Sequence, residues 1–283
     1  MRIALIGAPG QLGTSLETTL IGDILALGHD QIEITESASV DAALSALKAE
    51  LVVNCAAYNF VDRAEDEPEV AYRHNALGPH NLARWCAAHD AVLVHVSTDY
   101  VFGLEGHHHR PFTEEDLPRP NSSYAVSKLA GEYFVSSLCP RHYVVRTCGL
   151  YGRARSPGKG NFVETMLRLG SERDELAIVN DQRCTPTWVG DLAKAIQSLT
   201  TTDAYGLYHA TNAGDATWYE FAQEIFRLAG IEVAARPITS DEFGAKAERP
   251  AYSVLDNKKL SATIGYELRD WREALALYLK QRQ

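Results

Sequence analysis

The chain has 283 residues, of which 46% are hydrophobic and 23% charged, the balance of a soluble globular protein of one large domain or two modest ones. Its formal net charge of −10, without any run of basic residues, argues against nucleic acid as a partner. No segment resembles a cleavable signal, and no apolar run is long enough to cross a bilayer. We therefore expect a cytoplasmic protein with no membrane partner.

The five cysteines, Cys55, Cys86, Cys139, Cys148 and Cys184, are odd in number and lack the spacing of metal ligands. Reduced thiols are the simplest interpretation, and we expect no metal site.

The first element is a short apolar strand, Arg2–Ile6, followed at once by the turn GAPGQLG at residues 7–13 and a helix over Thr14–Leu20. A strand, a glycine turn and a helix in this order are the context of a dinucleotide-binding fingerprint. The glycines permit close approach of the backbone, and the helix N-terminus offers free N–H groups to a pyrophosphate. A plain glycine turn is the alternative, which the N-terminal position disfavours.

A second strand over Ile24–Leu27 ends in Gly28-His29-Asp30. A dinucleotide fold often has an acid there for the adenosine ribose, and Asp30 is a candidate that lies a little late. NAD and NADP both remain open, although His29 in place of an acid predicts that NADPH is accepted at least as well as NADH.

A helix over Val40–Ala49 leads to a third strand, Leu51–Asn54, whose end reads Cys55-Ala56-Ala57-Tyr58. Small residues at this edge of a sheet let a cofactor lie close, although tight packing between helix and sheet would also explain them.

A long helix is predicted over Glu69–Ala88. The next strand, Ala91–Val96, delivers Ser97-Thr98-Asp99, and the polar segment that follows is irregular, with a surface loop at His107–His109.

Residues Asn121-Ser122-Ser123 cap a helix that carries Tyr124 and Lys128, four residues apart and hence on one face. A tyrosine, a neighbouring ammonium that lowers its pKa and a Thr or Ser hydroxyl suit the reduction of a carbonyl group. The tyrosine gives a proton to the new alkoxide, and the hydroxyl holds the carbonyl. Asp99 is equally well explained as a site residue or as a turn residue after its strand.

A strand over His142–Arg146 completes an alternation of strands and helices that predicts a doubly wound parallel α/β sheet. We expect a dinucleotide-binding domain over residues 1–150, to which residues from about 176 to 210 return, and a smaller α/β part over 151–283 that is interleaved with it. The later part is expected to contain helices over Asn161–Leu169, Asp191–Leu199, Trp218–Ala229 and Trp271–Gln281, and strands over Leu176–Val179 and Tyr205–Ala210. His95, Trp218 and Trp271 are interpreted as core residues.

These residues resemble the extended short-chain dehydrogenase/reductase family, with its Rossmann-type sheet, and within it the dTDP-4-dehydrorhamnose reductases. The resemblance covers nearly the whole length. It depends on GAPGQLG at 7–13, VVNCAAYNFVDRAE at 52–65, STDYVF at 97–102, YAVSKLAGE at 124–132, GNFVETMLRL at 160–169, NDQRCTPT at 180–187 and TWYEFAQEIF at 217–226.

The resemblance implies NADPH- or NADH-dependent reduction of the C4 ketone of a nucleotide-linked 4-dehydro-6-deoxyhexose, with Thr98, Tyr124 and Lys128 as catalytic residues. Besides Tyr124 and Lys128, the implied cofactor-binding residues are Gly7, Gly10, Gln11, Leu12, Gly13, His29, Glu33, Ile34, Ala56, Ala57, Tyr58, Asn75 and Ser97. Besides Thr98, the implied substrate-binding residues are Asn59, Val61, Asp99, Tyr100, Asn161, Phe162 and Arg249.

The chain departs from the family pattern at Gly149, where the family commonly has a tryptophan that packs on the sugar. Another nucleotide-sugar ketoreductase or epimerase, and a non-catalytic regulatory subunit of the same fold, therefore stay open as alternatives. The expected partner is a nucleotide sugar, and a homodimer is an open alternative to a monomer.

Overall fold

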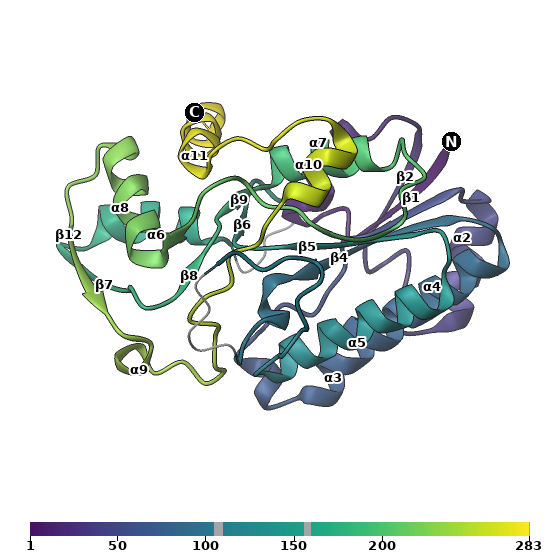
Figure 1. Cartoon of the computed structure of the whole chain (residues 1–283), viewed down its shortest axis with the longest axis horizontal. Coiled ribbons are helices and arrows are strands. Elements are labelled where there is room, and N and C mark those ends of the chain that lie inside the picture. Colours follow the sequence, from purple (N-terminus) through teal and green to yellow (C-terminus); the bar gives the residue numbers. More distant parts are fainter. Residues whose placement is uncertain (105–109, 156–159, 283) are drawn as a thin grey trace.

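The computed structural model describes residues 1–104, 110–155 and 160–282. The loop predicted at His107–His109 lies outside these residues. The centre of the molecule is a sheet of six parallel strands in the order β10-β5-β4-β3-β1-β2 (Figure 1). These strands are β1 Arg2–Ile6, β2 Asp23–Leu27, β3 Leu51–Asn54, β4 Val92–Thr98, β5 His142–Thr147 and β10 Gly206–His209. The predicted fold class is confirmed.

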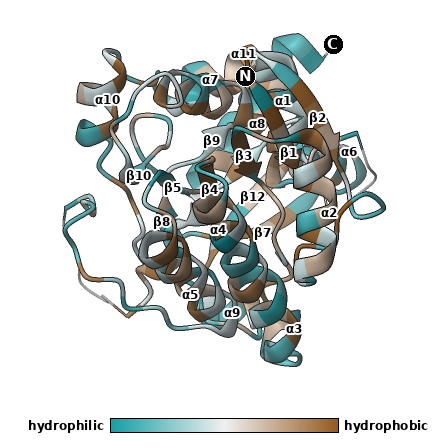
Figure 2. Ribbon diagram, turned by 90° about the vertical axis from the view of Figure 1, so that its right-hand side faces the viewer, coloured by the Kyte–Doolittle hydropathy of each residue, from teal (hydrophilic) through white to brown (hydrophobic). Residues whose placement is uncertain are grey.

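Successive residues of β1 point to opposite faces of the sheet and so serve two separate cores. Ile3 and Leu5 join the core on one face, and Ala4 and Ile6 join the core on the other. The first face is covered by α1 (Gln11–Thr19) and α7 (Val189–Leu199), the second by α2 (Ser37–Leu47), α4 (Gly78–Ala88) and α5 (Ser123–Leu138). Figure 2 shows hydrophobic residues concentrated on the central strands. Covering both faces is what a parallel sheet requires.

The single helix predicted over residues 69–88 is wrong, because it is divided. Helix α3 (Pro68–Tyr72) is followed by a π-helical turn, Arg73–Leu77, and then by α4. Pro79 has no N–H with which to bond the Asn75 carbonyl four residues earlier, so the helical ladder is interrupted there. The freed carbonyl meets α5 at Gly131, where an added Cβ would lie 2.2 Å from it.

Most of the remaining elements gather beyond one end of the sheet, at the left of Figure 1, whereas helix α10 (Lys258–Ile264) lies against α7 and β10. Three short strand pairs connect them: β7 Glu175–Val179 with β12 Ala234–Ile238, β6 Leu150–Tyr151 with β9 Thr187–Trp188, and β8 Arg183–Cys184 with β11 Ala216–Thr217. The α-helices of this later part are α6 Phe162–Glu172, α8 Trp218–Ala229, α9 Ser240–Phe243, α10 Lys258–Ile264 and α11 Trp271–Arg282. Short 3₁₀ turns lie at Arg63–Glu65 and Asp99–Val101. Among the described residues, no helix is long and apolar enough to cross a membrane.

Candidate active site

Helix α5 begins where the sequence predicted, because two side chains bond its first N–H groups. The Ser122 hydroxyl accepts from the Ala125 N–H at 3.3 Å, and the Glu65 carboxylate accepts from the Ser123 N–H at 2.7 Å. The following turn presents Tyr124 and Lys128, which are only 8% and 2% exposed. Both side chains are therefore held inside the protein.

Thr98 is the last residue of β4, two residues beyond the predicted end of that strand. Its hydroxyl donates to Asp99 Oδ1 at 3.2 Å and is hydrogen-bonded to Tyr124. A hydrogen-bonded series thus runs from Tyr124 through Thr98 to Asp99.

Burial raises the pKa of Tyr124, and the hydrogen bond with Thr98 opposes that shift. Burial also lowers the pKa of Lys128 to about 8, opposed by the nearby Glu132 carboxylate. The Lys128 ammonium donates to the Val96 carbonyl at 2.7 Å. The sequence predicted that Lys128 lowers the pKa of Tyr124, but here the Lys128 charge is directed at a backbone carbonyl, and burial decides the shift.

Asp99 is 2% exposed, and the Ser253 hydroxyl donates to its Oδ2 at 2.5 Å. Burial raises the pKa of this carboxyl to about 6, against the lowering effect of hydrogen bonds from Cys148, Ser253 and Thr98. Asp99 opens a 3₁₀ turn and also lines the cavity described next, so both sequence interpretations apply to it.

A cavity of about 330 Å³ lies over the carboxyl ends of β1, β3, β4 and β5, where parallel sheets bind ligands. It brings together most of the predicted site: Gly7, Gly10, Gln11, Leu12, Gly13, Ala57, Asn59, Val61, Ser97, Thr98, Asp99, Tyr100, Tyr124 and Lys128. The glycine turn and the tyrosine–lysine pair, more than 100 residues apart in the chain, thus share one cavity.

Three predicted cofactor residues lie beneath this cavity instead of lining it. The Asn75 amide bonds both the N–H and the carbonyl of Tyr58, at 2.8 and 3.0 Å, and fixes the loop after β3. The backbone of Ala56 packs under Gly7, where an added Cβ would lie 2.7 Å from the Ala56 nitrogen. Gly7 also has φ +77°, a backbone conformation that favours glycine. Both this conformation and the close approach of Ala56 therefore require glycine at position 7.

The residues predicted for the adenosine end lie after β2, away from the catalytic side chains. His29 is exposed, with its ring centroid 6.4 Å from that of His74. Glu33 accepts from the Thr35 N–H at 3.0 Å, and Ile34 is buried beside Gly78.

The predicted residues of the later part also lie outside the cavity lining. Asn161 caps α6 and donates to Gln11 Oε1 at 2.9 Å, which connects that helix to the glycine turn. Arg249 is paired with Asp62 at 2.8 Å. Phe162 packs against Trp218, with ring centroids 4.8 Å apart.

Seven further residues line the cavity: Cys55, Val96, Thr147, Cys148, Gly149, Leu150 and Trp218. Gly149 was singled out in the sequence as a departure from the family pattern, and the other six were not predicted as site residues. Extending the β5 prediction by one residue and applying the rule on strand ends would have included Thr147. Trp218 was interpreted as a core residue. That interpretation is correct for Trp271, which is 1% exposed, but Trp218 is only half-buried and forms part of the cavity wall.

Ser97 is engaged in a buried network that supports the catalytic strand. Its hydroxyl donates to Glu132 at 2.5 Å, and Glu132 forms a buried ion pair with Arg146 at 2.7 Å. These contacts connect β4, α5 and β5. His95, predicted as a satisfied core histidine, is bonded by Asn54 on one ring nitrogen, while its Nε2 has no partner in the described part of the chain.

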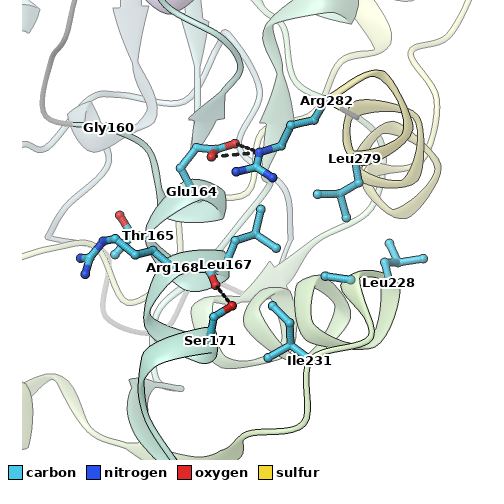
Figure 3. Close-up of a pocket in the computed structure, with 11 residues that line it drawn as sticks. Gly160, Glu164, Thr165, Leu167, Arg168, Ser171, Leu228, Ile231, Leu279 and Arg282 are labelled. Carbon is cyan, nitrogen blue, oxygen red and sulfur yellow. Dashed lines mark hydrogen bonds and ion pairs between the residues drawn. The ribbon is translucent and has the colours of Figure 1, made fainter.

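A larger cavity of about 820 Å³ lies elsewhere, between α6, α8 and α11 (Figure 3). Leu167, Leu228 and Leu279 give it an apolar part, and Glu164 and Arg282, which also line it, form an ion pair at 2.9 Å. None of the predicted site residues lines it.

The smaller cavity fits a dinucleotide. Gly10 is the N-cap of α1 and provides no side-chain bond to its N–H groups, which leaves them for an anionic ligand. An added Cβ at Gly10 would meet only the Gly7 carbonyl, at 3.2 Å, and Gly10 lines the cavity. The buried Thr147 hydroxyl, which lines the other end, has no partner among the described residues.

This fold and this combination of Thr98, Tyr124 and Lys128 define a Rossmann-type oxidoreductase of the short-chain dehydrogenase/reductase class. Residues 1–283 match the model of the family described as RmlD substrate binding domain. The chain belongs to this family.

Relatives are similar in sequence to this chain along nearly its whole length. A dTDP-4-dehydrorhamnose reductase of Streptomyces griseus is 42% identical over 279 residues, covering 95% of this chain and 90% of the relative. A probable dTDP-4,6-dihydroxy-2-methyloxan-3-one 4-ketoreductase of Streptomyces antibioticus is 42% identical over 281 residues, covering 97% and 93%.

Solved structures of similar sequence have the same fold. A dTDP-4-dehydrorhamnose reductase of Clostridium acetobutylicum has a TM-score of 0.95 at 42% identity, with 100% of both chains covered. The enzyme of the same name from Bacillus anthracis, in complex with NADP, has a TM-score of 0.94 at 38% identity, with 99% of both chains covered. The recognised family is thus confirmed.

Proposed function

We propose that the protein reduces the C4 ketone of a nucleotide-linked 4-dehydro-6-deoxyhexose, converting dTDP-4-dehydro-L-rhamnose to dTDP-L-rhamnose. The observation that carries this proposal is the hydrogen-bonded series of Tyr124, Thr98 and Asp99 in one cavity with the glycine turn. The names of relatives that are about 40% identical along the whole chain support the substrate.

Tyr124 is proposed to supply the proton to the oxygen at C4. A free tyrosine has a pKa of about 10, and burial raises that of Tyr124, so the hydroxyl carries its proton at neutral pH. The phenolate left after transfer needs a positive charge nearby, which Lys128 is proposed to provide from the next turn of the helix. Thr98 is proposed to hold the carbonyl in a fixed position for both transfers.

NADPH or NADH is the proposed cofactor. When bound, its reduced nicotinamide supplies the hydride to C4. Gly7, Gly10, Gln11, Leu12 and Gly13 are proposed to hold the pyrophosphate, with Ala57 beside the cofactor. NADPH is favoured because His29 takes the place of an acid at the end of β2 and because the relative from Bacillus anthracis binds NADP.

Asp99, Tyr100, Asn59 and Val61 are proposed to line the sugar pocket. We also propose the domain boundaries expected from the sequence: residues 1–150 bind the cofactor, with residues from about 176 to 210 returning to this domain, and residues 151–283 mainly bind the substrate. We further propose a cytoplasmic enzyme. Light scattering tests whether the protein is a homodimer, because a measured mass of 31.2 kDa, that of one chain, would exclude a dimer.

The decisive experiment is turnover on a panel of 4-keto nucleotide sugars with each cofactor, for the wild type and for Tyr124→Phe. Losing a positioned acid typically reduces the rate by about 10²–10⁴, and we expect this loss with cofactor binding preserved. Near wild-type turnover of Tyr124→Phe on every substrate would refute the assignment. If the wild type turned over none of them, the non-catalytic regulatory subunit would be the better description.

The panel should also contain 4-keto sugars other than the rhamnose precursor. The ketoreductase of Streptomyces antibioticus is as similar to this chain as the rhamnose enzyme of Streptomyces griseus, at 42% identity each. Gly149, which gives the cavity wall no side chain, is a further reason to compare the sugars directly.

A further inference from the structure

The Thr147 hydroxyl is a buried polar group that lacks a partner within the described residues, although the side chain is only 4% exposed. A buried hydroxyl without a hydrogen bond is unfavourable, and native proteins rarely keep one without a reason. Thr147 is the last residue of β5 and lines the cavity that holds Tyr124 and Lys128.

The sheet register determines which way this side chain points. Thr147 is paired with Thr98 on the neighbouring parallel strand. Paired residues of adjacent strands point to the same face of a sheet, with Cβ atoms about 5 Å apart. Since Thr98 is bonded to Tyr124, the Thr147 side chain lies beside the catalytic hydroxyls.

The cavity follows the strand ends in spatial order. It begins at the glycine turn after β1, passes Cys55 after β3 and Val96 to Thr98 on β4, and ends at Thr147 on β5. A dinucleotide whose pyrophosphate lies at the glycine turn reaches across the sheet from there. Its nicotinamide must lie beside the carbonyl held by Thr98, which is the position next to Thr147.

We propose that the Thr147 hydroxyl binds the carboxamide of the nicotinamide ring and thereby fixes the orientation of that ring. The carboxamide is the hydrogen-bonding group that projects from the ring, and because it contains both a carbonyl and an amine, it can pair with a hydroxyl in either direction. This inference depends on the proposed function, since it assumes a nicotinamide cofactor.

The test is the affinity for NADPH and the melting temperature of Thr147→Val, which keeps the shape of the side chain and removes the hydroxyl. We expect the Kd for NADPH to rise by about 3- to 10-fold, the worth of one hydrogen bond. The Kd for 2′-phospho-ADP-ribose, which lacks the nicotinamide, should not change. The melting temperature without nucleotide should rise by about 2–4 °C, because an unsatisfied buried group is removed. Thr147→Ser should bind NADPH like the wild type.

Thr187→Val is the matched control. Thr187 is also buried, but its hydroxyl donates to the Thr185 carbonyl at 3.1 Å, and it does not line the cavity. This variant should melt at a lower temperature and bind NADPH like the wild type.

Three results would overturn the inference: unchanged NADPH affinity in Thr147→Val, an equal loss of affinity for both nucleotides, or a fall in melting temperature like that of Thr187→Val. These are distinct from failure of the proposed function, in which the wild type would bind NADPH but turn over none of the 4-keto nucleotide sugars. A wild type that bound neither nucleotide would refute both the inference and the proposed function.

Discussion

Replacing Lys128 with methionine should stabilise the folded protein while it impairs the enzyme. Burial lowers the pKa of Lys128 from 10.5 to about 8, so the charged form is disfavoured in the folded state. At pH 7 this shift corresponds to about 3 kcal/mol of lost stability. Methionine removes that cost but leaves the Val96 carbonyl without its donor, which lowers the stability by roughly 1–2 kcal/mol. We expect a net gain of about 1–2 kcal/mol.

The pH dependence identifies the cause of this gain. Because the folded pKa lies below the unfolded one, the unfolded chain binds more protons between pH 8 and pH 10.5. Wild-type stability should therefore rise with pH across this window, and the penalty should be fully present below pH 8. Lys128→Met should lack this rise, so its advantage should shrink between pH 7 and pH 9.5.

Urea denaturation of both proteins at pH 7 and pH 9.5 measures this difference. Lys194→Met is the control for the loss of a lysine, because Lys194 is exposed on α7. A Lys128→Met variant that is less stable than the wild type at pH 7, or a stability difference that is the same at both pH values, would refute the reasoning. Turnover and cofactor affinity should both fall in this variant.

Gly10→Val should abolish NADPH binding with the fold intact, because the branched side chain would extend into the space beside the glycine turn. Unchanged affinity for NADPH by calorimetry would contradict the proposed position of the cofactor. Burial raises the pKa of Asp99 to about 6, so kcat/KM should fall below pH 6, where the carboxylate is protonated and stops accepting from Thr98. The pH–rate profile of Asp99→Asn should lack this inflection. Trp218→Leu should raise the KM for the nucleotide sugar by about 10-fold without changing the Kd for NADPH, whereas an unchanged KM would place Trp218 outside the sugar pocket.

Local patterns were sufficient to predict much of this fold. The strand, glycine turn and helix at the N-terminus are determined by residues close in the chain, and β1 and β3 match their predictions exactly in extent. The π-helical turn was missed because it depends on Pro79 and on contact with Gly131 of another helix. Thr147 was missed because β5 was predicted one residue too short. Trp218 was missed because only the folded chain brings the start of α8 to the cavity.

The bond from Ser253 to Asp99 has a consequence for the order in which the site is assembled during synthesis. The two residues are 154 positions apart, so Asp99 leaves the ribosome long before its donor. A chain that stops short of Ser253 therefore lacks the hydroxyl that donates to Asp99 Oδ2, so this part of the cavity is complete only after the last part of the chain has been made.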